Sequence, residues 1–325
     1  MFQLESVSLR GNDRWRLHQI SLSFQSAATA VIGYSGAGKS SLLNLLVGFE
    51  RPDAGRIQRP DAAISSAAGA PSARLPFFWV PQTGGLWPHL SVRQHLQAVQ
   101  PEFLQNSPNL PFSADEILDR FALSHLANSR PAELSPGETS RLAAARGLAA
   151  APAWLIMDEP LSHVDPVRKP AFWHAIRELA GAAGSSLIFS CHEPEVVLRQ
   201  ASLAVCLRHG EIWFSGTVQE LYLRPSCAEL GRFLGPLNWW TPAEATALTQ
   251  SSSQLPADSC IRPHQVLLQP AAKSSLQVLE SQNCGLYHET RLQPPAGAPV
   301  TVLHQHSDVP LQSGVSVAIS LRGVA

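Results

Sequence analysis

The chain has 325 residues, a formal net charge of −1 at pH 7 and a hydrophobic fraction of 45%. This length accommodates one large domain and a smaller one, and the near-zero charge argues against a general nucleic-acid-binding protein. The five cysteines are scattered without a C-x-x-C pair, which favours reduced thiols over a metal site or a disulfide framework.

Neither a leader nor a membrane span is predicted. The first residues lack the basic-then-apolar pattern of a signal peptide, and no apolar run reaches the roughly 18–20 residues that a membrane helix needs. The Ala-rich segment 142–157 is interrupted by Arg146 and Pro152. We therefore expect a cytoplasmic protein that meets the membrane only through a partner.

Alternating apolar residues near the N-terminus predict two strands, one within 2–9 and one within 20–24, joined around Gly11-Asn12-Asp13. A short buried strand is predicted at 29–32, and a helix with a wide apolar face is predicted from Lys39 until Gly48. The loop between them reads G-x-x-x-x-G-K-S and comprises Gly33, Tyr34, Ser35, Gly36, Ala37, Gly38, Lys39, Ser40 and Ser41.

Strand, glycine loop and helix together are the context of a phosphate-binding loop in nucleoside triphosphatases. Glycines let the backbone N–H groups close around phosphate oxygens, and the helix N-terminus adds partial positive charge. Lys39 supplies an ammonium for the β- and γ-phosphates, and the Ser40 hydroxyl suits Mg²⁺. A glycine-rich turn with an incidental lysine is the simpler alternative, but it leaves the flanking strand and helix unexplained.

The next segments lead away from this loop and return to it. Residues 51–75 are rich in Pro, Ala, Ser and Gly and are predicted as a surface connection. A buried strand at 77–80 ends just before Gln82, which a flexible loop could move into a nucleotide site, although strand-end glutamines are commonly turn residues. Residues 91–130 are mostly helical in pattern, with proline breaks around 101–111.

Ser135, Pro136 and Glu138 predict a helix start, because Ser135 can cap the helix and Glu138 completes a capping box. An ordinary helix start would explain these residues locally. Further on, a buried strand at 154–157 ends in Asp158-Glu159. Adjacent carboxylates at a strand end are costly unless a cation or substrate uses them, although a structural salt bridge is the alternative.

In a phosphate-loop protein, Asp158 would hold Mg²⁺ through water, and Glu159 would orient and deprotonate the attacking water. His192 follows another buried strand at 186–190. A lone histidine there is usually structural, and the functional interpretation is an imidazole that reaches the γ-phosphate.

With residues 161–165, these motifs resemble the ATP-binding-cassette (ABC) ATPases over about residues 1–232. The resemblance implies that the chain binds ATP and Mg²⁺, that Gln82 contacts Mg²⁺ or the attacking water, and that Gln82 couples to a membrane subunit. It also implies a second copy of the chain, whose ATP would lie against the signature residues Ser135, Gly137 and Glu138, with Ser135 and Gly137 binding the γ-phosphate. Asp165 would communicate across that dimer interface.

Three features depart from the family pattern. Pro136 replaces the usual signature glycine and removes one N–H, and Glu138 replaces the common glutamine. The aromatic residue that stacks on adenine has no direct match: its position falls near Gly11, and Trp15 is the nearest candidate.

The composition changes near Gly235-Pro236. Trp239-Trp240 is interpreted as packing at the domain junction, and a Ser/Gln-rich stretch follows at 250–254. Short strand patterns then lie at 265–269, 275–281, 286–292, 299–305 and 315–322. Five short strands with Gly/Pro turns predict a small OB-like barrel. With residues 261–264, this segment resembles the accessory domain of import ATPases for molybdate, sulfate, iron, polyamines and sugars. His304 and His306 would share one strand face, which allows a metal or ligand site but favours solvent-exposed or partly buried strand histidines.

We therefore expect an α/β phosphate-loop NTPase of the ABC ATPase type at 1–234, with a helical subdomain at about 87–135, followed by an all-β OB-like domain at 235–325. The expected function is ATP hydrolysis that powers import of a small solute, an inorganic anion, metal ion, polyamine or sugar. The protein would act as a homodimer on the cytoplasmic face of the inner membrane, with a permease and, indirectly, a solute-binding protein, and without nucleic acid.

Two other classes remain as alternatives. A soluble ABC ATPase could act as a mechanical switch on a non-transport partner such as the ribosome or nucleic acid, but the sequence shows no duplicated cassette, long coiled coil or basic surface. A phosphate-loop kinase or GTPase would leave the signature and His192 unexplained.

Overall fold

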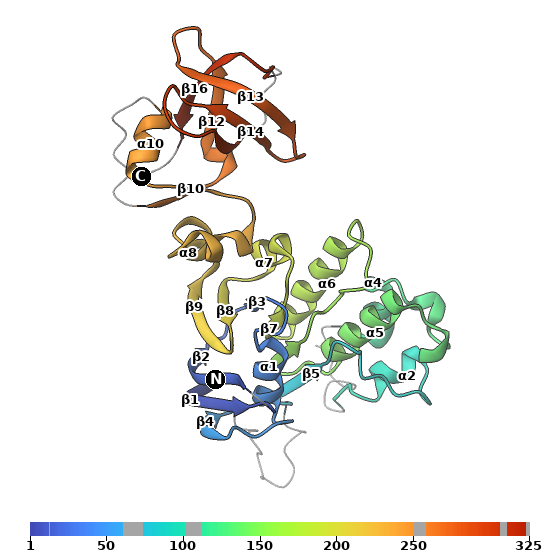
Figure 1. Ribbon diagram of the computed structural model, residues 1–325. Helices are drawn as coiled ribbons and strands as arrows, with labels where there is room; N and C mark the ends of the chain where they lie inside the picture. The colour runs from blue at the N-terminus through green and yellow to red at the C-terminus, as the bar shows by residue number, and fades with distance from the viewer. Residues whose placement is uncertain (13, 61–73, 102–111, 250–257, 306–310, 323–325) are drawn as a thin grey trace. The chain divides into compact units, whose positions relative to one another are not determined.

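The computed structural model describes residues 1–325 except 13, 61–73, 102–111, 250–257, 306–310 and 323–325 (Figure 1). The expectations for Asp13, for the proline breaks in 102–111, for the stretch 250–254 and for His306 lie outside the described residues. The chain divides into two compact units, Met1–Val218 and Gln219–Ala325. This division precedes the boundary expected at 234/235, because Arg262 of the second unit donates hydrogen bonds to carbonyls between Tyr222 and Pro236.

The first unit contains a three-stranded antiparallel sheet in the order β2-β1-β4. The predicted pair is β1 (Phe2–Arg10) and β2 (Trp15–Phe24). The expected surface connection, 51–75, contains the strand β4 (Ala54–Gln58), which pairs with the other edge of β1. Residues 61–73 of this segment lie outside the described residues. Because β4 is almost wholly exposed, it carries no alternating apolar residues that could have revealed it.

The second sheet of this unit has six strands in the order β5-β6-β7-β3-β8-β9, parallel except for β9. Its central strands β3 (Thr29–Gly33), β6 (Trp154–Met157) and β7 (Ser186–Ser190) are buried, as continuous apolar runs predict. The strand β5 (Phe77–Val80) lies at the edge and only Val80 is buried, so the prediction of a buried strand is corrected there. The sheet is completed by β8 (Leu203–Arg208) and β9 (Glu211–Thr217).

The helix α1 (Lys39–Val47) joins the two sheets into one core. Its buried leucines pack in one cluster with residues of β1, β2, β6, β7 and β8. Each fully buried leucine contributes about 1.5–3 kcal/mol, so the cluster fixes the start of α1, and with it the preceding loop. As predicted, α1 ends at Gly48, whose φ of 83° is left-handed.

Helices of the first unit lie beside the sheet in Figure 1. The helix α5 (Pro136–Ala149) packs against β5 and β6, and α6 (Lys169–Ala182) packs against β7. The helical subdomain contains α2 (Val92–Gln97), α4 (Ala114–Arg120) and the short turns η1 (Ser124–Leu126) and η2 (Pro131–Glu133). The helix α7 (Pro194–Gln200) follows β7.

The second unit is built on a five-stranded antiparallel sheet in the order β12-β16-β13-β14-β15, as its sequence pattern predicts. The strands are β12 (Val266–Pro270), β13 (Leu276–Asn283), β14 (His288–Gln293), β15 (Val300–His304) and β16 (Ser316–Leu321). The N–H of Gln305, just after β15, donates to the carbonyl of Val266 at 2.9 Å, so the two edge strands approach each other. This closure agrees with an OB-like barrel.

Several elements of this unit were not predicted. They are α8 (Val218–Leu223), which begins at the last residue of the first unit, α9 (Ala228–Gly231), η3 (Arg232–Leu234), β10 (Asn238–Trp240), α10 (Pro242–Thr249), β11 (Ser259–Ile261) and η4 (Pro263–Gln265). Trp240 is buried in the core of the second unit with residues of α10 and the sheet. No helix among the described residues is both long and apolar enough to cross a membrane.

Candidate active site

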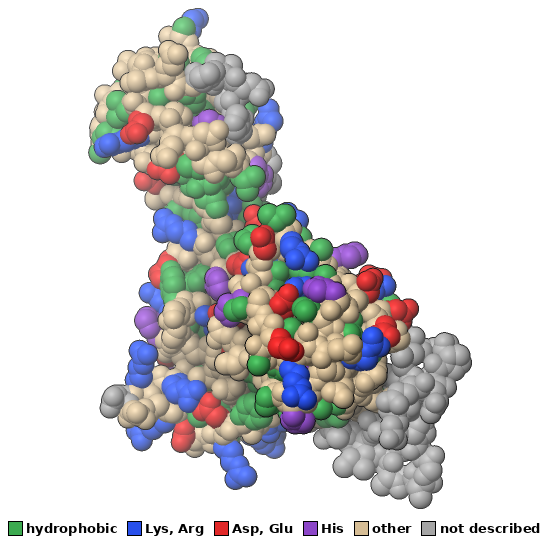
Figure 2. Space-filling model, turned by 90° about the vertical axis from the view of Figure 1, so that its right-hand side faces the viewer, with side chains coloured by type: hydrophobic (Ala, Val, Ile, Leu, Met, Phe, Trp, Pro, Cys, Tyr) green, Lys and Arg blue, Asp and Glu red, His purple; other side chains and the backbone are tan. Residues whose placement is uncertain are grey.

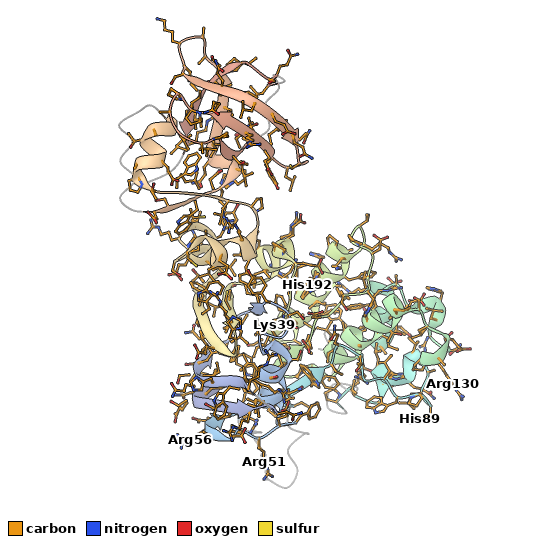
Figure 3. All side chains as sticks on the ribbon, viewed as in Figure 1. Lys39, Arg51, Arg56, His89, Arg130 and His192 are labelled. Carbon is orange, nitrogen blue, oxygen red and sulfur yellow. The ribbon has the colours of Figure 1, made fainter. Side chains whose placement is uncertain are left out.

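A cleft of about 800 Å³ opens at the phosphate-binding loop in the first unit. It is lined by residues from β2, the loop, α1, the segments after β5 and β6, and the β8–β9 turn: Arg14, Trp15, Arg16, His18, Ser35, Gly36, Gly38, Lys39, Ser40, Ser41, Gln82, Glu159, His209 and Glu211. Figure 3 labels Lys39 in the middle of this unit, where α1 begins. The loop, Gln82 and Glu159, which are far apart in the sequence, therefore face one space.

The loop follows the carboxyl end of β3, the central strand. Two of its glycines are required by close contacts. Gly33 has a φ of 151°, and a Cβ there would lie 2.4 Å from the Leu207 carbonyl oxygen. Gly38 has a φ of 106°, and a Cβ there would lie 2.7 Å from the Arg16 carbonyl oxygen. The Lys39 ammonium donates to the carbonyls of Gly33 (2.9 Å) and Tyr34 (3.1 Å). Lys39 is therefore held across the loop, at the N-terminus of α1.

Ser41, on the first turn of α1, is held by an arginine that the motif does not include. The Arg16 guanidinium donates to the Ser41 hydroxyl from Nε (3.0 Å) and Nη2 (2.8 Å). It also forms a two-point ion pair with Glu50, through Nη1 (2.6 Å) and Nη2 (2.9 Å). These contacts link β2, α1 and the segment after α1.

The paired carboxylates lie beyond β6, two strands from β3, and share one anchor. Ser190, at the end of β7, is fully buried. Its hydroxyl donates to the buried carboxylate of Asp158 and accepts the backbone N–H of Glu159 at 2.8 Å. One hydroxyl thus positions both acidic residues.

The Glu159 carboxylate is half-buried and has two polar neighbours. Gln82 donates to it from Nε2 at 3.1 Å, and His192 Nδ1 lies 3.5 Å from the other oxygen. The backbone of Glu159 has a φ of 46°, which is uncommon for a residue with a side chain and occurs preferentially at functional sites. The structure therefore brings together Gln82, Glu159 and His192, the three residues for which a catalytic role is expected from the sequence.

The signature begins α5 with the predicted capping box. Ser135 N and Oγ both donate to the Glu138 carboxylate at 2.8 Å, and the Glu138 N–H donates back to Ser135 Oγ at 3.3 Å. These hydrogen bonds, from the Ser135 backbone first and its side chain second, lower the pKa of Glu138. Pro136 occupies the first helical position, and Gly137 lies so close to the carbonyl of His163 that a Cβ would approach it at 3.0 Å.

The signature does not join the phosphate loop of its own chain. Among the described residues, the lining of the cleft includes none of Ser135, Gly137, Glu138 and Asp165. Asp165 accepts the Val167 N–H at 2.8 Å and so shapes the turn before α6.

The cleft is also lined by residues of β2 and of the β8–β9 turn. Trp15 lines it and remains 40% exposed, with the Arg10 guanidinium 5.2 Å from its ring centre. His18 Nδ1 lies 3.0 Å from a Glu211 carboxylate oxygen. An exposed aromatic face beside the phosphate loop suits a nucleobase.

The segment after Gln82 is anchored by Arg146 of α5. Its guanidinium donates to the carbonyls of Gly84 (3.0 Å) and Gly85 (2.7 Å) and lies 4.7 Å from the Trp87 ring centre. Burial lowers the pKa of Arg146, and the two carbonyls compensate in part for the lost hydration. The segment is therefore attached to the signature helix.

Sequence reasoning missed Arg16, Glu50, Ser190 and Arg146. Ser190 could have been found, because a hydroxyl at the end of an apolar strand is a polar exception that needs a partner. Arg16 and Glu50 offered no such signal, since each is ordinary in its local segment.

In the second unit, His304 is fully buried and hydrogen-bonded, with Nε2 2.8 Å from Thr290 Oγ1 and Nδ1 2.8 Å from the Gln305 carbonyl. The expectation of an exposed or partly buried histidine is corrected. The described residues include no group of three or more His, Cys, Asp or Glu side chains that could hold a metal ion.

A glycine loop lies between a central parallel strand and a helix, and it shares its cleft with Glu159, which follows another strand after the buried Asp158. This arrangement defines a phosphate-loop NTPase. Residues 17–162 match the ABC transporter family. The chain is 32% identical over 238 residues to the Fe(3+) ions import ATP-binding protein FbpC 2 of Pectobacterium atrosepticum, covering 72% of this chain and 68% of that protein. The chain belongs to the family of ABC transporter ATP-binding proteins.

Two further relatives are similar over the first unit. The Fe(3+) ions import ATP-binding protein FbpC of Pseudomonas fluorescens is 36% identical over 67% of this chain and 62% of its own length. The Molybdenum import ATP-binding protein ModC of Rhodospirillum rubrum is 35% identical over 64% of this chain and 57% of its own length. The chain thus matches less than two thirds of these two proteins.

A solved dimeric ATP-binding cassette, described in a post-hydrolysis state bound to ADP and Pi, shares the fold. Its TM-score is 0.54 at 23% identity, covering 67% of this chain and 99% of that one.

Proposed function

We propose that this chain is the ATP-hydrolysing subunit of an ABC importer. The observation that carries the proposal is the convergence of Lys39, Gln82 and Glu159 on one cleft, with Glu159 and Asp158 held by Ser190. Family membership and the import ATP-binding relatives support the same function.

Binding of the nucleotide would use the loop and the face of Trp15. The loop N–H groups, the start of α1 and Lys39 suit the phosphates, while Trp15 suits the base. Mg²⁺ fits the available donors, because the Ser40 hydroxyl, the Gln82 amide oxygen and the Asp158 carboxylate are the hard oxygen ligands that it prefers. When bound, Mg²⁺ would neutralise charge on the β- and γ-phosphates.

Hydrolysis needs a base near the γ-phosphate. The Glu159 carboxylate would accept a proton from a water as that water's oxygen bonds to the γ-phosphorus, while the bond to the β–γ bridging oxygen breaks and its electron pair leaves with ADP. Gln82 contacts one oxygen of this carboxylate and His192 contacts the other, and together they orient the base. His192 is also placed to stabilise negative charge on the γ-phosphate.

The signature requires a second copy. Ser135 and Gly137 lie outside the cleft of their own chain, so we propose that they bind the γ-phosphate held by a partner copy in a head-to-tail dimer, with Glu138 and Asp165 at the interface. Closing and opening of two such sites would drive a membrane permease between its inward- and outward-facing states.

For the cargo we propose an inorganic ion, because the relatives are named for import of Fe(3+) and molybdenum. The chain would then sit on the cytoplasmic face of the membrane as a peripheral subunit, with a solute-binding protein delivering the ion to the permease. On the face shown in Figure 2, acidic and basic side chains are interspersed over the first unit.

The test is steady-state ATPase activity per molecule as a function of protein concentration, with Glu159→Gln as the matched variant. We expect the rate to rise with concentration as dimers form, and Glu159→Gln to bind ATP but turn over at least about 10²-fold more slowly, since general-base catalysis contributes about 10²–10⁴-fold. Wild-type turnover in Glu159→Gln would contradict the assigned base. A concentration-independent rate in a protein that is monomeric by sizing would contradict action between copies.

A further inference from the structure

The Arg16 guanidinium uses its donors on two partners at once. Nε and Nη2 donate to the Ser41 hydroxyl at 3.0 and 2.8 Å, while Nη1 and Nη2 bind the two carboxylate oxygens of Glu50 at 2.6 and 2.9 Å. Both Arg16 and Ser41 also line the nucleotide cleft. The planar fork of an arginine allows this geometry, whereas a lysine ammonium cannot reproduce it.

The two hydrogen bonds from Arg16 determine whether the Ser41 hydroxyl can donate or accept a further hydrogen bond. A serine hydroxyl has one hydrogen and two acceptor lone pairs, and a guanidinium can only donate. Because Ser41 Oγ accepts two N–H groups from Arg16, its acceptor capacity is filled and its own hydrogen points away from the guanidinium. Ser41 is thereby prepared as a hydrogen-bond donor at the start of α1.

The charge of Arg16 is already balanced. The two-point ion pair with Glu50 makes the pair neutral overall, so Arg16 does not act as an additional phosphate-binding cation such as Lys39. We therefore assign its effect on a bound nucleotide to the Ser41 hydroxyl that it holds.

Resting on the proposed function, we infer that Arg16, fixed by Glu50, is a positioning residue that holds the Ser41 hydroxyl as a donor to a phosphate of the bound nucleotide. Arg16 directly follows Trp15 on β2, and Trp15, the residue proposed to meet the base, lines the same cleft. The phosphate concerned is therefore one near the nucleoside, which ATP and ADP share.

The test is the affinity for ATP and for ADP, measured by titration calorimetry with Mg²⁺ in the full chain carrying Glu159→Gln, so that ATP is not consumed. The variants are Arg16→Met, Ser41→Ala, their combination, and Arg16→Met with Glu50→Gln. The control is Arg56→Met, because Arg56 of β4 also pairs with a glutamate, Glu5 at 3.3 Å, but is exposed and lies far from Lys39 in Figure 3.

We expect Arg16→Met to weaken ATP and ADP alike by about 10-fold, the effect of one charge-assisted hydrogen-bond arrangement. The combination with Ser41→Ala should be little worse than either single variant, since Ser41→Ala deletes the hydroxyl donor and Arg16→Met can act only by leaving that same hydroxyl unheld. Adding Glu50→Gln to Arg16→Met should recover part of the affinity, because it removes the negative charge of a carboxylate that has lost its arginine partner. Arg56→Met should bind like the parent.

Unchanged affinities in Arg16→Met, effects that multiply in the combination with Ser41→Ala, or a loss confined to ATP would each overturn the inference. A purely structural role of Arg16 would not disappear in the Ser41→Ala background. Should Arg16→Met not fold, Ser41→Ala alone still tests the phosphate contact, because equal loss of ATP and ADP is required of it. If the parent binds neither nucleotide, the proposed function fails instead.

Discussion

Replacing Ser190 by alanine tests the arrangement of the two acidic residues. The substitution removes the hydroxyl that donates to Asp158 and accepts the Glu159 N–H at 2.8 Å, in a fully buried position. A hydrogen bond to a charged group contributes about 1.5–3 kcal/mol, and an unsatisfied buried donor costs about 1–3 kcal/mol. Because the two losses overlap in one small site, we expect the free energy of unfolding to fall by about 2–4 kcal/mol.

The same change should slow ATP hydrolysis. Glu159 keeps its unusual φ of 46° partly through this hydrogen bond, so its carboxylate is expected to shift when the bond is lost. A shift of about 1 Å in a catalytic group costs on the order of 10²-fold in rate. We expect kcat to fall about 10- to 100-fold, with a smaller change in KM, because Lys39 and the phosphate loop are untouched.

The assays are urea unfolding and steady-state ATPase activity, with Ser21→Ala as the control. Ser21 also accepts a backbone N–H, that of Ser6 at 3.0 Å, but it is exposed on β2, so its loss should cost less than about 0.5 kcal/mol. If Ser190→Ala changes stability no more than Ser21→Ala and keeps kcat within about twofold of the wild type, the hydroxyl does not position Asp158 and Glu159.

Two further outcomes are expected. Trp15→Ala should raise the Kd for ATP about 10-fold or more, because base stacking on an aromatic ring contributes about 1–3 kcal/mol. Trp15→Phe should retain most of the affinity. Equal binding by both variants and the wild type would show that Trp15 does not contact the base. Burial raises the pKa of Cys191 to about 11, so this thiol stays protonated up to pH 8. Iodoacetamide should therefore label the exposed Cys284 before Cys191 in the native protein. If mass spectrometry detects rapid labelling of Cys191, its buried position is contradicted.

Much of the site could be predicted because its residues are contiguous or follow strand ends. The phosphate loop is one unbroken motif, and Glu159 and His192 each follow an apolar run that is recognisable as a strand. The carboxyl ends of parallel strands meet at one edge of a sheet, so these positions converge once the strands are placed.

The remaining parts depend on tertiary contacts that leave no local pattern. The ion pair of Arg16 and Glu50 joins residues 34 positions apart, and neither position is unusual among its neighbours. The strand β4 is exposed and polar, and only its pairing with β1 defines it. Likewise, the unit boundary could not be placed from composition, because it depends on which carbonyls accept hydrogen bonds from the buried guanidinium of Arg262.

That guanidinium, of Arg262, has a consequence for dissecting the protein. Arg262 is 1% exposed and donates to the carbonyl of Tyr222 in α8 and to those of Gly231, Gly235 and Pro236, which lie between α8 and β10. A chain cut at the compositional boundary, 234/235, would lose the Tyr222 and Gly231 acceptors and leave a buried cation without half of its acceptors. A fragment that begins at 219 carries all four, so it is the piece to express when the barrel is to be studied by itself.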